Sequence, residues 1–147
     1  MNCKQRKRKI INMATKIFVN LPVKDLNKSI EFFTQLGFTF NQQFTDETAT
    51  AMIIAENIYV MLLVEKRFKD FTKNEIADAF RYTESIICID AESREKVDEM
   101  VQNAIKGGGT APNEKQDHGW MYGHGFQDLD GHLWEVAYMD TAAIPQV

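Results

Sequence analysis

Apolar residues recur along this chain with the periods of strands and helices, and they divide it into two similar halves. Residues 16–23 alternate as a strand does. A helix is predicted over 26–36, because Asp25 stands before it as an N-cap and Gly37 follows as a terminating glycine. Three strand-like stretches come next, near 39–45, 49–55 and 58–64. The first half therefore predicts the order strand, helix, strand, strand, strand.

The second half repeats this order. Residues 85–89 read as a strand, and Asp90 or Ser93 can cap a helix over 94–105 whose apolar stripe has helical spacing. Glycines 107–109 end that helix. Further strands are predicted near Thr110, 120–127 and 132–138. The repeat indicates two modules, 14–64 and 83–140, which make one domain over 14–140.

Three segments lie outside the modules. The charged stretch 65–82 joins them, and a short helix from Asn74 is predicted within it. Residues 1–13 are expected to be a disordered basic tail, with a nucleic-acid-binding arm as the alternative. Residues 141–147 are expected to be a C-terminal tail.

The last hairpin holds a carboxylate in an unusual place. Asp130-Gly131 favours a tight turn between two strands. Glu135 follows on an alternating strand among apolar neighbours, where an unpaired charge is costly. Glu135 is therefore expected to face a cavity and to contact a polar partner.

Two motifs carry a family resemblance: Leu21-Pro22-Val23-Lys24-Asp25-Leu26 with Ser29-Ile30-Glu31-Phe32-Phe33, and Asp128-Leu129-Asp130-Gly131-His132-Leu133-Trp134-Glu135. In this order and within a repeated topology, they resemble the vicinal oxygen chelate superfamily of glyoxalase I, bleomycin-resistance proteins and extradiol dioxygenases. The resemblance implies an α+β fold in which two βαβββ modules form an incomplete barrel around a cavity. It also implies a homodimer, whose modules pair within one chain or across two chains. Glu135 stands where the family has its final metal ligand.

The other family ligand positions do not carry ligands. The position seven residues before Asp25 is Phe18, and the equivalent position before Asp90 is Thr83. The third ligand position falls among the apolar residues 61–63. Since a stable transition-metal site needs three or four ligands, a degenerate metal site and no cofactor are expected.

Two interpretations of Glu135 remain open. In the first, Glu135 pairs with His124, or with Tyr122. The pair acts either as an acid–base couple, which makes these three the candidate catalytic residues, or as a recognition pair for a polar ligand. In the second, Glu135 and His124 hold a divalent metal at a displaced site. The candidate ligand-binding residues are Phe18, Asn20, Ser85 and Trp120.

Composition limits the partners and the compartment. The net charge is −4, but the five cations within 1–12 leave 12 Lys and Arg against 21 Asp and Glu elsewhere, so no nucleic-acid partner is expected for the folded part. No apolar run reaches the length of a membrane span, and two isolated cysteines indicate the cytoplasm.

We therefore expect a glyoxalase/bleomycin-resistance-like protein that binds a small organic molecule in its barrel cavity. One alternative is a metal-dependent enzyme with relocated ligands, either like lactoylglutathione lyase or like a dioxygenase. Another is a dimeric module that only sequesters its ligand.

Overall fold

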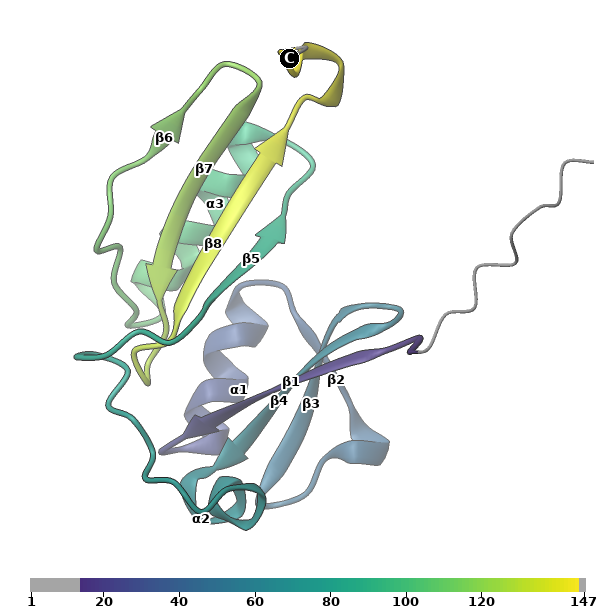
Figure 1. The fold of residues 1–147 in the computed structure, drawn as a ribbon, viewed down its shortest axis with the longest axis vertical. Coiled ribbons are helices and arrows are strands. Elements are labelled where there is room, and N and C mark those ends of the chain that lie inside the picture. The colour runs from purple at the N-terminus through teal and green to yellow at the C-terminus, as the bar shows by residue number, and fades with distance from the viewer. Residues whose placement is uncertain (1–13, 146–147) are drawn as a thin grey trace, which may run out of the picture.

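The computed structural model describes residues 14–145 as two four-stranded mixed sheets with helices (Figure 1). The first sheet has the strand order β1-β4-β3-β2, and the second has the order β5-β8-β7-β6. The strands of the first sheet are β1 (Ile17–Val23), β2 (Thr39–Asn41), β3 (Ala49–Ala55) and β4 (Ile58–Val64). Those of the second are β5 (Ile86–Asp90), β6 (Gln116–Asp117), β7 (Met121–Gln127) and β8 (Leu133–Met139).

Each module has one long helix, and short helices lie in the loops and the connection. They are α1 (Leu26–Gln35), α2 (Glu65–Phe68), α3 (Arg94–Lys106) and the short 3-10 helices η1 (Gln42–Phe44), η2 (Lys69–Phe71) and η3 (Thr141–Ala143). Each long helix begins where a side-chain oxygen satisfies a free backbone N–H. Asp25 accepts from the Lys28 N–H at 3.1 Å, and Ser93 accepts from the Lys96 N–H at 3.2 Å. Gly37 follows α1 with a φ of 98°, which glycine adopts without strain.

Both sheets have one topology. β1 runs parallel to β4 and β5 parallel to β8, while the remaining pairs are antiparallel. The predicted α+β fold of two βαβββ modules is therefore confirmed, and the two sheets stay separate without closing into a barrel.

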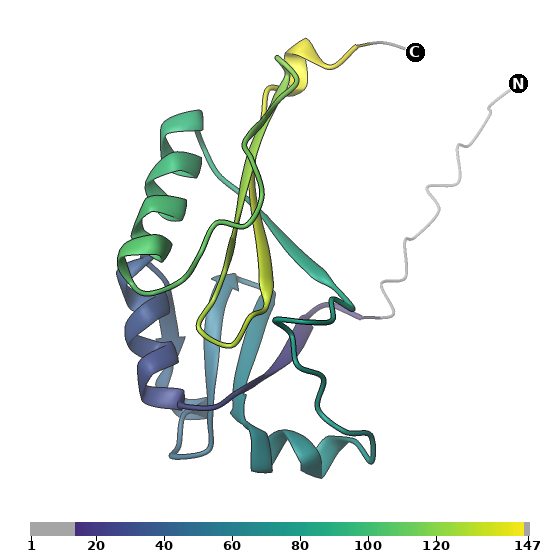
Figure 2. The same ribbon diagram turned by 90° about the vertical axis from the view of Figure 1, so that its left-hand side faces the viewer.

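A single core joins the two halves, because α1 and α3 lie on the same side of both sheets (Figure 2). α1 contributes the buried Phe33, whose ring centroid lies 5.2 Å from that of Trp134 on β8. Trp134 in turn stacks on Phe126 of β7, with 3° between the rings. In the part of the chain that the structure describes, neither α1 nor α3 packs on the opposite face of either sheet, which we call the helix-free face (Figure 2).

The β7–β8 turn of the second half docks onto the first half. Asp130 Oδ1 accepts from the Lys24 N–H at 2.8 Å, and His132 Nε2 donates to the Pro22 carbonyl at 2.7 Å. The buried Asp128 shapes this turn, because it accepts from the His132 N–H at 3.0 Å and from Trp134 Nε1 at 3.0 Å. Burial raises the pKa of Asp128, while His132 and these donors act in the opposite direction.

Several predicted elements need correction. No helix begins at Asn74: the helical turns of the connection, α2 and η2, end at Phe71, and the residues after η2 are irregular. The strand near Thr110 is a single bridge to Gln127. The expected basic tail 1–13 lies outside the described residues, and the expected tail from 141 contains η3.

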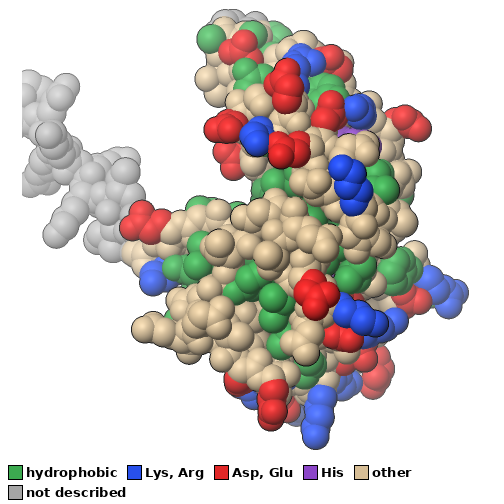
Figure 3. Space-filling model, turned by 180° about the vertical axis from the view of Figure 1, so that it is seen from behind, with side chains coloured by type: hydrophobic (Ala, Val, Ile, Leu, Met, Phe, Trp, Pro, Cys, Tyr) green, Lys and Arg blue, Asp and Glu red, His purple; other side chains and the backbone are tan. Residues whose placement is uncertain are grey.

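The charges on the surface do not by themselves indicate a binding partner. On the side where α1 and α3 lie, acidic and basic side chains are intermixed (Figure 3). Among the described helices, none is long and apolar enough to cross a membrane.

Candidate ligand-binding site

A cavity of about 390 Å³ opens where the two halves and their connection meet; we call it the junction cavity. β1 supplies one wall, the start of the second half and the β7–β8 turn supply another, and the connecting segment supplies the rest. The lining residues are Asn20, Leu21, Pro22, Phe68, Thr72, Asn74, Glu75, Ile76, Ala77, Ala79, Tyr82, Thr83, Glu84, Ser85, Gly131, His132 and Leu133. The docked turn described above therefore sets the distance between two of these walls.

The junction cavity brings together Asn20 and Ser85, two of the predicted ligand-binding residues. Asn20 lies on β1, and Ser85 immediately precedes β5, so each half provides one neutral hydrogen-bonding side chain. Phe68 and Tyr82 add aromatic surface. A cavity of this size, lined about equally by apolar and by polar or charged residues, suits a small organic molecule that carries polar groups.

Most of the remaining lining comes from the segment 65–82, which the sequence interpretation treated as a connection. Among the residues it adds are Asn74, Glu75 and Tyr82, and Glu84 follows two residues later. Long connections with little secondary structure are uncommon in compact domains and often carry function. The length of this connection is therefore the one feature of the sequence that could have indicated a part in the site.

Phe18 and Trp120 do not border the junction cavity, so the structure does not bring them together with Asn20 and Ser85 there. Phe18 lies nearer the start of β1 and stacks on Tyr59, with ring centroids 5.0 Å apart and 12° between the rings. Its side chain is 48% exposed on the sheet face that has no helix. Trp120 sits in the turn before β7, where its carbonyl accepts from the Asp140 N–H at 2.7 Å.

Glu135 is exposed on that same helix-free face of the second sheet. Its register partners are Gly125 on β7 and Cys88 on β5. Glu135 and Gly125 border a hollow of about 130 Å³, whose lining includes residues of all four strands of this sheet. Burial raises the pKa of the neighbouring Cys88 thiol, and the negative charge of Glu135 adds to this.

The expected partners of Glu135 point to the other face. His124 pairs with the buried Val136, and neighbouring residues of a strand alternate between faces, so His124 and Glu135 diverge although both border the small hollow. His124 Nε2 donates to the Asn113 carbonyl at 3.1 Å. The predicted contact of Glu135 with His124 or Tyr122 is therefore wrong, because a shift of one residue in register reverses the face.

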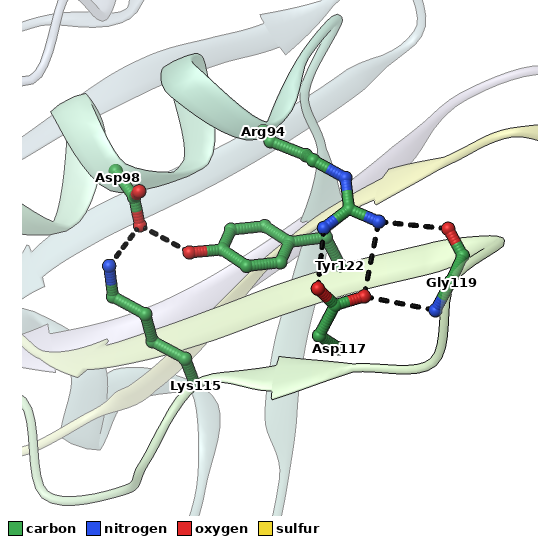
Figure 4. A network of polar contacts seen from close by, with 6 residues as sticks. All are labelled: Arg94, Asp98, Lys115, Asp117, Gly119 and Tyr122. Carbon is green, nitrogen blue, oxygen red and sulfur yellow. Dashed lines mark hydrogen bonds and ion pairs between the residues drawn. The ribbon is translucent and has the colours of Figure 1, made fainter.

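Tyr122 belongs instead to a polar network between α3 and the β6–β7 hairpin (Figure 4). Its hydroxyl donates to Asp98 at 2.8 Å, and the Arg94 guanidinium lies 5.0 Å from its ring centroid. Arg94 also binds both oxygens of Asp117, at 2.7 and 3.1 Å. This pairing lowers the pKa of Asp117 to about 2. The network fastens the hairpin to the helix and leaves Tyr122 without a free hydroxyl for Glu135.

The donor set does not fit a metal centre. Phe18 cannot ligate, Met61 is the only sulfur group among 61–63, and Thr83 offers a neutral hydroxyl. Within residues 14–145, no group of three or more His, Cys, Asp or Glu side chains lies close enough to hold an ion. His124 and Glu135, the pair named for a displaced site, are separated by the sheet.

Comparison with known proteins decides the family. The model of the Glyoxalase/Bleomycin resistance protein/Dioxygenase superfamily matches residues 14–136. The chain belongs to this superfamily. None of the curated protein sequences matches it.

Several solved structures share the fold. The hypothetical protein SA1046 from S. aureus is 27% identical, with a TM-score of 0.74 over 86% of this chain and 95% of that one. The fosfomycin resistance protein FosX from Listeria monocytogenes is 17% identical, with a TM-score of 0.62 over 89% and 98%. TioX from Micromonospora sp. ML1 is also 17% identical, with a TM-score of 0.60 over 86% and 99%. At these identities FosX and TioX show a common fold alone.

Proposed function

We propose that this superfamily member binds a small organic molecule in the junction cavity and does so without a resident metal. One observation carries the proposal: Asn20 and Ser85, which occupy corresponding places in the two modules, line one cavity of about 390 Å³. Their neutral groups can orient a polar ligand, while Phe68 and Tyr82 provide apolar contact.

The metal-free part of the proposal is supported by the donor set. A metal-dependent lyase or dioxygenase would need Glu135 to share an ion with other ligands, and its register partners are Gly125 and the thiol of Cys88. Elemental analysis of protein purified without chelator tests this. About one equivalent of metal in the wild type that is lost in Glu135→Gln would overturn it.

A fragment screen tests the binding proposal. We expect fragments to raise the melting temperature of the wild type and to shift the amide resonances of Asn20 and Ser85, since a ligand at about 100 times its Kd adds about 2.7 kcal/mol. Ser85→Phe should abolish both effects by filling the cavity. Thr39→Phe is the matched control, because Thr39 is an exposed strand residue that does not line the cavity. Equal binding by wild type and Ser85→Phe would reject the proposal.

We further propose that the chain acts as a homodimer. The helix-free faces of the sheets carry large apolar side chains that are about half exposed: Phe18 48%, Ile86 52% and Met139 49%. A second copy packed on this face would remove them from water. Sedimentation analysis should give twice the chain mass, and Phe18→Ser with Met139→Ser should shift it toward the monomer. A wild-type monomer at tens of micromolar would reject the dimer.

A further inference from the structure

We propose that the ligand of the junction cavity carries a positive charge, as an amine or ammonium group does, and that Glu84 recognises it. This inference rests on the proposed function, since it concerns the same cavity. It adds the chemical class of the ligand and a recognition residue that the sequence patterns did not indicate.

The charged groups in the lining have one sign. Glu75 and Glu84 both border the cavity, and the described residues that line it include no Lys or Arg. His132, the remaining basic side chain there, already donates Nε2 to the Pro22 carbonyl. A carboxylate or phosphate ligand would therefore meet negative charge without a compensating cation.

The two carboxylates are not equivalent. Glu75 has a cation beside it, because Lys69 Nζ lies 3.4 Å from Glu75 Oε1. Glu84 forms neither an ion pair nor a side-chain hydrogen bond within residues 14–145. Glu84 is thus the lining carboxylate whose charge stays available to a ligand, and a charge-assisted hydrogen bond is the strongest contact it can make.

The two aromatic residues that line the cavity, Phe68 and Tyr82, have different surroundings. Tyr82 borders the cavity, but the Arg81 guanidinium already lies 5.6 Å from its ring centroid. The recognition of charge is therefore assigned to Glu84 and not to this ring. Phe68 contributes an apolar surface for the organic part of the ligand.

Neutral groups complete the arrangement. Ser85, next to Glu84 in the chain, and Asn20 across the cavity offer hydroxyl and amide oxygens that accept N–H donors. A protonated amine has up to three such donors, so one carboxylate and two neutral acceptors match its requirement.

Three probes with one ring and different charge test the inference: 2-phenylethylamine, 2-phenylethanol and phenylacetate. Each is titrated into the full-length protein, and amide shifts of the cavity residues give the Kd. We expect the amine to bind roughly fivefold more tightly than the alcohol, the factor that one charge contact near a surface supplies. Phenylacetate should bind most weakly, and added salt should reduce the preference for the amine.

Glu84→Gln should bring the Kd of the amine to that of the alcohol without changing the Kd of the alcohol. Glu47→Gln is the matched control: it removes the same charge from an exposed residue that borders none of the described cavities, and it should keep the preference.

Equal or tighter binding of phenylacetate or the alcohol at the cavity would overturn the cationic ligand and leave the binding proposal standing. Retention of the amine preference in Glu84→Gln would overturn the role of Glu84. If no probe shifts the cavity residues, the cationic class is rejected, and the fragment screen with Ser85→Phe then decides separately whether the cavity binds any ligand.

Discussion

His132 Nε2 donates to the carbonyl of Pro22 over 2.7 Å, although 110 positions separate the two residues in the chain. The bond joins the β7–β8 turn to β1, and both residues line the junction cavity. Asp130 acts in parallel, two residues earlier in the same turn, through the Lys24 N–H. The turn therefore controls how the halves meet and how wide the cavity is between them.

Asp130→Ala should weaken this docking. The Lys24 N–H loses its acceptor, and Ser29 Oγ loses a partner at 3.4 Å, so we expect the free energy of unfolding to fall by about 1 kcal/mol. Urea denaturation followed by tryptophan fluorescence measures it. Asp130→Asn keeps an amide oxygen in place and should retain most of the stability. An Ala variant as stable as the wild type would show that the bond contributes nothing.

Gly131→Ala should loosen the connecting segment. Gly131 has a φ of 90°, and a Cβ there would lie 2.7 Å from the backbone N of Phe80. Gly119, with a φ of 80° and open space around it, is the matched control. Both variants suffer the left-handed strain of about 1 kcal/mol, but only Gly131→Ala must displace Phe80. Faster tryptic cleavage after Lys73 or Arg81 in that variant alone is the expected result; equal cleavage would contradict it.

Two glycines of β7 should differ in their tolerance of alanine. A Cβ on Gly125 would lie 2.8 Å from the Trp134 carbonyl oxygen, whereas one on Gly123 would lie 3.6 Å from the Val136 oxygen, an ordinary contact. Gly125→Ala should therefore reduce the free energy of unfolding by about 1–3 kcal/mol. Gly123→Ala should be neutral or slightly stabilising, because alanine restricts the unfolded chain. Thermal unfolding of both variants checks this, and the reverse order would contradict it.

Asp117 should make the stability sensitive to acid. Its folded pKa is about 2, because Arg94 binds the carboxylate, and this lies below the ordinary value of 3.8. Between these values the unfolded chain holds more protons, so the contribution of Asp117 is present above about pH 4 and is lost as the pH falls toward 2. The stability difference between wild type and Asp117→Asn should shrink over that range.

Urea midpoints at pH 5, 3 and 2 give this difference. Glu47→Gln serves as the surface control, since Glu47 has no side-chain partner within residues 14–145. A constant difference between wild type and Asp117→Asn at all three values would contradict the prediction.

The fold was predictable because local chemistry and periodicity agree. Asp25 and Ser93 cap the helices where the apolar stripes begin, and Gly37 ends α1 with positive φ. The Asp130-Gly131 pair predicted the last turn, which the structure places between β7 and β8. These features depend on neighbours within a few residues, which is the range that a sequence pattern reports.

The site was predictable only in part. Asn20 and Ser85 could be paired because the modules repeat, so corresponding positions are related by the fold. The partner of Glu135 could not be predicted, since the register of β7 against β8 decides whether His124 or Gly125 lies beside it. Glu84 and Tyr82 lie in irregular chain, where no periodicity indicates which side chains turn inward.

The walls of the junction cavity differ in how freely their residues can be substituted. Substitutions on β1 or in the docked turn disturb hydrogen bonds that hold the modules together, so these walls are constrained by folding. The segment from Thr72 to Glu84 has no strand pairing to preserve. Exchanges there can alter the charge and shape of the cavity at little cost in stability. Related chains with this architecture should therefore differ in their ligands chiefly through this segment, which makes it the first region to exchange when engineering a new specificity.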